Sequence, residues 1–143
     1  MKSRELLQKT LNHEPTERIV LDLGSSPTTG IHVLAVEKLR EYYGLEKKPV
    51  RVIEPYQMLG LVEEDLIEAI GIDIIGAWGP DTMFGYPNRP PLKEFKTFWG
   101  QTVLVPELFS SDTDEKGNLL TYPEGDVSVG PSAKMPPDRK SVV

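Results

Sequence analysis

The sequence contains no cysteine and only two histidines among its 143 residues. Without cysteine, the chain can form no disulfide, no thiolate nucleophile and no thiolate zinc site. His13 and His32 are far apart in the sequence and have no thiolate beside them, so they do not match a zinc-binding spacing. The sequence therefore predicts no metal site within this chain.

Basic residues are also scarce, because 16 Lys and Arg stand against 22 Asp and Glu, which gives a formal net charge of -6. An acidic chain lacks the basic face that nucleic acid or an anionic membrane surface attracts. No apolar run approaches the length of a membrane span, and the N-terminal residues lack the apolar core of a signal peptide. We therefore expect a cytoplasmic protein that binds neither nucleic acid nor membrane.

The first half of the chain alternates strand-like and helix-like segments. Residues 18–23 and 72–78 are nearly continuous apolar runs, typical of parallel strands covered on both faces. The spacing of apolar residues predicts helices over residues 3–12, 31–43 and 63–70. Strands that alternate with helices indicate an α/β fold with parallel pairing. Asp22 and Asp73, inside or at the edge of these strands, are expected to be buried polar anchors.

The second half has a different character, because helical periodicity ends near Pro80. Turn-forming residues there separate pairs of short strand-like segments. This pattern predicts two hairpins, which pair residues 95–98 with 102–105 and residues 110–113 with 119–122. We interpret residues 92–129 as an antiparallel insertion and residues 137–143 as a loose tail.

The loop between the first predicted strand and the following helix is the first candidate site. Ligands of parallel α/β proteins bind beyond the carboxyl ends of the strands, and N–H groups at a helix N-terminus attract anions. The substrate-binding candidates are Gly24, Ser25, Ser26, Thr28, Thr29 and Gly30. A helix cap with a turn of small residues explains the same composition, and the glycine spacing matches neither common nucleotide-binding fingerprint.

His32 and Asp81 are the candidate catalytic residues. His32 begins the helix after the loop, where it could act as a base or a hydrogen-bond donor, and the alternative is a half-exposed first-turn histidine. Asp81 follows the second predicted strand, at the end where barrel enzymes place catalytic groups. The alternative for Asp81 is an aspartate that begins a turn.

Several motifs occur in a specific order: Leu11-Asn12-His13-Glu14-Pro15, Thr29-Gly30-Ile31-His32, Gly71-Ile72-Asp73-Ile74-Ile75, Trp99-Gly100 and Pro131-Ser132-Ala133-Lys134-Met135-Pro136. Through these motifs and their order, residues 1–136 resemble the N-terminal part of uroporphyrinogen decarboxylase superfamily proteins. The resemblance implies the N-terminal portion of a (β/α)8 TIM-type barrel with an antiparallel β-hairpin insertion.

The superfamily includes a haem-pathway decarboxylase and corrinoid-linked methyltransferases. Its decarboxylases carry an arginine-rich segment after the first strand that binds substrate carboxylates, whereas residues 24–30 contain no arginine. Neutral hydroxyl groups do not replace guanidinium groups in holding carboxylates. The resemblance therefore favours the methyltransferase-like branch, which transfers a methyl group from a corrinoid to a thiol or related acceptor. A uroporphyrinogen decarboxylase-type lyase, and a non-catalytic remnant or small interaction module, stay open as alternatives.

The resemblance also implies cofactors and partners. Corrinoid and zinc are expected for the full-length enzyme, with the zinc ligands in the later part of the barrel and no cofactor within this chain. The partners would be a small-molecule or corrinoid-protein substrate, and homo-oligomerisation stays open. Because superfamily members are much longer, we expect a fragment that is inactive alone, with residues 137–143 as the product of a truncated or frameshifted gene.

Overall fold

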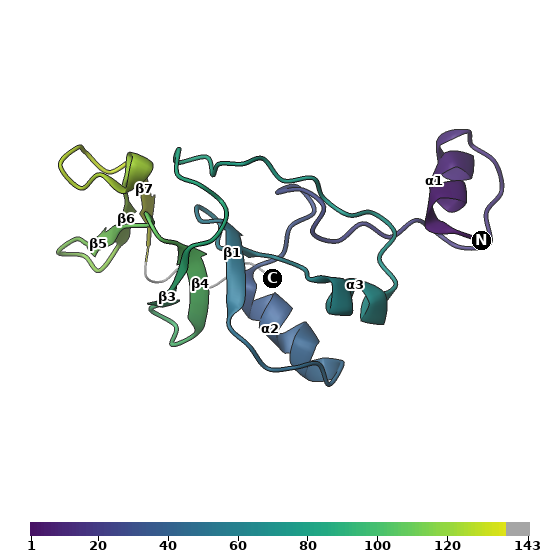
Figure 1. Cartoon of the computed structure of the whole chain (residues 1–143), viewed down its shortest axis with the longest axis horizontal. Helices are drawn as coiled ribbons and strands as arrows, with labels where there is room; N and C mark the ends of the chain where they lie inside the picture. The colour runs from purple at the N-terminus through teal and green to yellow at the C-terminus, as the bar shows by residue number, and fades with distance from the viewer. Residues whose placement is uncertain (137–143) are drawn as a thin grey trace.

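The computed structural model describes residues 1–136, which form an elongated molecule of three α-helices and seven short strands (Figure 1). The helices are α1 (Ser3–Leu11), α2 (Val33–Tyr42) and α3 (Glu64–Ile70). The strands are β1 (Val50–Glu54), β2 (Leu59–Gly60), β3 (Leu92–Lys96), β4 (Thr102–Pro106), β5 (Ser111–Thr113), β6 (Leu119–Thr121) and β7 (Ala133–Met135). No helix in this part of the chain is both long enough and apolar enough to cross a membrane.

The strands form two sheets. The first has the order β2-β1-β4-β3, and its central pair is parallel, with Val50 of β1 opposite Val103 of β4. The β1–β2 and β3–β4 pairs that flank this centre are antiparallel. The second sheet has the order β5-β6-β7 and is entirely antiparallel. The described chain is therefore β-rich, with one mixed and one antiparallel sheet.

This topology shows that the predicted α/β fold, an N-terminal portion of a (β/α)8 barrel with a hairpin insertion, is wrong. Residues 18–23 and 72–78 form no strand, and one backbone hydrogen bond joins them, from Asp73 N–H to Leu21 O at 2.9 Å. The hairpin over 92–106 is no insertion either, because β4 pairs with β1 at the centre of the sheet. An apolar run predicts burial, but only a partner in register makes it a strand.

The local predictions fared better. All three predicted helices are present, and Gly71 ends α3 in the left-handed conformation with a φ of 81°, which costs glycine little. Both predicted hairpins are present as β3–β4 and β5–β6. Strands β1, β2 and β7 were missed. Residues 137–143, predicted to be a loose tail, lie outside the described residues.

The core lies where α2 packs on the first sheet (Figure 1). Valine side chains from three elements meet there, and each is almost completely buried: Val33 and Val36 of α2, Val50 and Val52 of β1, and Val103 and Val105 of β4. Leu66 extends this core to α3 and is fully buried. Removing such side chains from water is the main stabilising contribution, which explains why α2 and β1 hold a fixed position.

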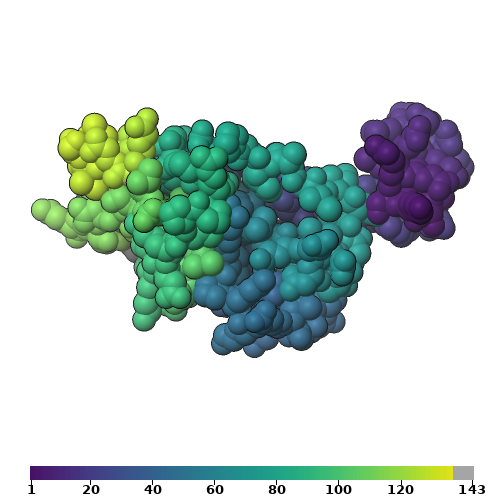
Figure 2. All heavy atoms as spheres, viewed as in Figure 1, coloured from purple at the N-terminus to yellow at the C-terminus, as the bar shows by residue number. Residues whose placement is uncertain are grey.

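α1 and the residues after it form a lobe joined to the rest of the molecule by a narrow neck (Figure 2). Asp73 lies at the junction, and its side chain is only 1% exposed. Its carboxylate accepts hydrogen bonds from both Arg18 guanidinium nitrogens (2.6 and 2.7 Å), the Ser3 hydroxyl (2.7 Å) and the Leu21 N–H (3.0 Å). These donors, Arg18 first, hold the pKa of Asp73 well below its usual range. Asp73 is therefore the buried anchor that the sequence predicts.

Candidate functional site

The substrate-binding candidates form a closed polar loop around Asp22. The Asp22 carboxylate accepts hydrogen bonds from the Ser25 N–H (3.3 Å), the Ser25 hydroxyl (2.7 Å) and the Thr29 hydroxyl (3.2 Å). Gly24 N–H closes the loop by donating to Thr29 O at 2.9 Å. Both hydroxyl groups donate inward to a carboxylate. The lone pairs of Ser25 Oγ, and the one on Thr29 Oγ1 that the Ser26 N–H does not use, can therefore accept further hydrogen bonds.

The other members of the loop have different surroundings. Ser26 N–H donates to Thr29 Oγ1 at 3.3 Å, so Ser26 joins the same network. Gly30 N–H donates to Pro27 O at 3.4 Å, which continues the turn. Thr28 is exposed at the tip of the loop. The structure therefore gathers Ser25, Ser26 and Thr29 around one carboxylate and leaves Thr28 outside this cluster.

Residues 72–78 pass directly behind the loop, and Gly76 marks the closest approach. A Cβ atom on Gly76 would lie 2.2 Å from Ser25 O and 2.8 Å from the Ser25 carbonyl carbon. Only glycine fits so close to another backbone. This contact brings together two segments fifty residues apart and fixes the position of the Asp22 loop from behind.

The N-terminus of α2, which the sequence suggests as an anion site, has no unused amide in its first turn. Its first four N–H groups all have acceptors: Val33 donates to Met58 O (2.9 Å), Leu34 to His32 Nδ1 (3.2 Å), and Ala35 and Val36 to His32 O (2.9 and 3.1 Å). An anion would have to displace one of these bonds. The arrangement matches the capping alternative for this loop.

His32 is the N-cap residue of α2 and packs its ring against Trp99, with 4.9 Å between the ring centroids. Since Nδ1 accepts the Leu34 N–H, the neutral ring carries its proton on Nε2. Burial lowers the pKa of His32, which favours this neutral form near pH 7. His32 can therefore donate a hydrogen bond from Nε2 without carrying a charge.

Asp81 lies apart from this arrangement, in an exposed turn. It forms an isolated antiparallel bridge with Pro87, and Thr82 N–H donates to Tyr86 O at 2.9 Å within the same turn. Within residues 1–136, no hydrogen bond joins the Asp81 carboxylate to His32 or to the Asp22 loop. Asp81 fits the turn alternative, and its catalytic role stays a prediction.

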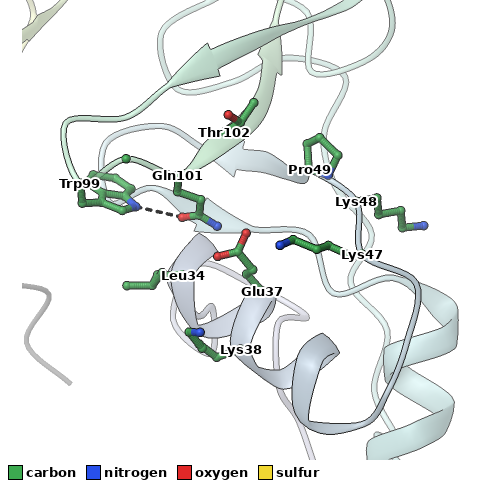
Figure 3. A pocket seen from close by; sticks show the side chains of 10 residues that line it. Leu34, Glu37, Lys38, Lys47, Lys48, Pro49, Trp99, Gln101 and Thr102 are labelled. Carbon is green, nitrogen blue, oxygen red and sulfur yellow. Dashed lines mark hydrogen bonds between the residues drawn. The ribbon is translucent and has the colours of Figure 1, made fainter.

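A groove of about 650 Å³ lies between α2 and the β3–β4 turn, and no sequence pattern predicted it (Figure 3). Trp99 is fixed beside it, because its indole Nε1–H donates to Gln101 Oε1 at 2.9 Å and Gln101 Nε2–H donates to Val33 O at 3.1 Å. Glu37 of α2 and Lys47 of the following loop also line it. The one sequence signal was the Trp99-Gly100 pair, which predicts only a turn.

The superfamily resemblance implies zinc ligands in a later part of the barrel, not in this chain. Within residues 1–136, no group of three or more His, Cys, Asp and Glu side chains is placed to hold a metal ion. We therefore derive no chemical step through a metal here.

Comparison with known proteins found no matching family model, no matching curated protein and no matching solved structure.

Proposed function

We propose that this chain is part of an enzyme of the uroporphyrinogen decarboxylase superfamily, in its methyltransferase-like branch. The reaction would transfer a methyl group from a methylated corrinoid to a thiol or a related acceptor. The order of the sequence motifs supports this proposal. The role of the present residues would be to bind and orient one polar group of the acceptor.

The Asp22 loop is the observation that carries the proposal. A carboxylate at its centre repels the several carboxylates of a uroporphyrinogen, and residues 24–30 supply no arginine to hold them. The lone pairs of Ser25 and Thr29 that accept no hydrogen bond within the loop instead suit a ligand group that donates hydrogen bonds. This chemistry favours a methyl acceptor with a hydroxyl, amine or protonated thiol group over a polycarboxylate.

His32 has a role that suits the same ligand. Its Nε2–H can donate a hydrogen bond to the acceptor, while its Nδ1 stays committed to the N-terminus of α2. A neutral imidazole donates this hydrogen bond without carrying a charge. Asp81 would enter the reaction only if its turn moved toward the loop.

A methyl-transfer assay tests the proposal. Methylcobalamin and a small thiol are incubated with the purified full-length gene product, and loss of the cobalt-bound methyl group is followed through the absorption spectrum of the corrinoid. A parallel reaction contains uroporphyrinogen. We expect demethylation of the corrinoid and no loss of carboxyl groups from uroporphyrinogen. Decarboxylation without methyl transfer would support the lyase alternative. The absence of both reactions would refute the enzymatic proposal.

Matched variants connect the activity to the loop. Thr29→Val keeps the size of the side chain but removes its hydroxyl, so we expect methyl transfer to fall by at least about tenfold, the effect of 1.4 kcal/mol on a rate. Thr113→Val makes the same chemical change on exposed β5 and should leave the rate unchanged. Equal rates in the two variants would argue against a role for the loop.

One observation favours the interaction-module alternative. Ile19 and Ile75, on the two apolar segments, are 81% and 72% exposed. Exposed apolar side chains that gather into one patch mark protein interfaces. If the chain is such a module, it should be monomeric with a single cooperative melt, and Ile75→Lys should leave that melt unchanged while abolishing partner binding.

A further inference from the structure

We propose that the groove between α2 and the β3–β4 turn binds a zwitterionic small molecule, namely an α-amino acid with an apolar side chain. This site goes beyond the proposed methyl transfer, since none of residues 24–30 lines the groove. Its volume of about 650 Å³ lies within the range of ordinary small-molecule sites, roughly 300–1,000 Å³.

Two unpaired opposite charges define the ligand. Glu37 and Lys47 extend from opposite walls of the groove and point toward one another (Figure 3). Within the described residues 1–136, neither side chain forms an ion pair, so they stay more than 4.0 Å apart. A ligand that carries an ammonium group and a carboxylate would place the first against Glu37 and the second against Lys47.

The neighbouring charges support this assignment. Lys38 is already paired with Glu41 at 2.8 Å, and Lys48 with Glu63 at 2.9 Å. Among the three lysines of the groove, Lys47 is the one that forms no ion pair within 4.0 Å in this part of the chain. A phosphate dianion would meet one available ammonium group and the repulsive Glu37 carboxylate, so the groove disfavours it.

The apolar part of the ligand is assigned from the end of the groove. Trp99 and Leu34 lie there, and the Trp99 ring is held by its hydrogen bond to the buried Gln101. An indole already fixed in place loses little conformational freedom when a ligand packs on it. An aliphatic side chain attached to the zwitterionic end of the ligand would reach this apolar surface.

Three probes that share the isobutyl side chain of leucine test the proposal. L-leucine carries both charges, 4-methylpentanoate lacks the ammonium group, and 3-methylbutylamine lacks the carboxylate. The signal is Trp99 fluorescence in a Trp78→Phe background, which leaves Trp99 as the single tryptophan. We expect saturable leucine binding with a Kd near about 1 mM, and binding about five- to tenfold weaker for each analogue.

Charge-removing variants then separate the two ends of the ligand. Glu37→Gln should weaken leucine binding about fivefold and not weaken 4-methylpentanoate binding, whereas Lys47→Gln should weaken both. Glu68→Gln, on an exposed position of α3 outside the groove, is the matched control and should change nothing. Thermal melts check that each variant folds. No leucine saturation below about 10 mM, or 4-methylpentanoate binding as tight as that of leucine, would overturn the proposal.

Discussion

Replacing Gly76 by alanine tests the contact on which the position of the Asp22 loop depends. The new Cβ would lie 2.2 Å from Ser25 O, and ordinary contact begins near 3.4 Å, so the two backbones must separate by about 1 Å. Forcing a methyl group into such a contact costs about 1–3 kcal/mol. That separation also strains the 2.9 Å bond from Asp73 N–H to Leu21 O, which joins the same segments. We expect the free energy of unfolding to fall by about 2 kcal/mol.

Urea denaturation measures this loss. With an m-value of about 2 kcal/mol/M, a loss of 2 kcal/mol lowers the midpoint by about 1 M. Gly79→Ala is the control, because its Cβ would meet nothing closer than 3.9 Å. Both changes stiffen the unfolded chain, so the difference between the two variants isolates the close contact. If Gly76→Ala is within about 0.5 kcal/mol of Gly79→Ala, the segments do not approach as described.

Three further perturbations test the core, the ion pair of the buried Arg40 and the cap of α2. Leu66→Ala should cost about 2–5 kcal/mol in urea titrations because its side chain is fully buried, whereas Leu11→Ala, 70% exposed, should cost less than about 0.5 kcal/mol. Arg40→Lys should cost about 1–2 kcal/mol in thermal melts, since it loses the paired bonds to the Asp65 carboxylate, both 2.8 Å. Burial lowers the pKa of His32 in the folded state, so its stabilising contribution is complete above the unfolded pKa of about 6.5 and is lost as the pH falls through the folded value. Urea midpoints at pH 7.5 and 5 should therefore differ less in His32→Asn, which keeps a capping side chain, and an equal pH dependence in both proteins would contradict the cap geometry.

Part of the candidate site could be predicted from the sequence and part could not. The Asp22 cluster could be predicted in part, because its members lie within seven residues of one another and small hydroxyl side chains bond locally. The contact of Gly76 with Ser25 could not be predicted, because the sequence of neither segment indicates that the other lies against it. The groove was missed for the same reason, because Glu37, Lys47 and Trp99 come from three separate segments.

The sequence by itself determined the elements whose causes are local. The spacing of apolar residues and Gly71 were enough for α2 and α3, and the turn residues were enough for both hairpins. The sheet order was a different matter, because β1 pairs with β4 across more than forty intervening residues. Residues 18–23 have the apolar character of a buried strand, yet only a partner in register could have made them one. Pairing is a property of two segments at once, and only the tertiary structure decided which segments meet.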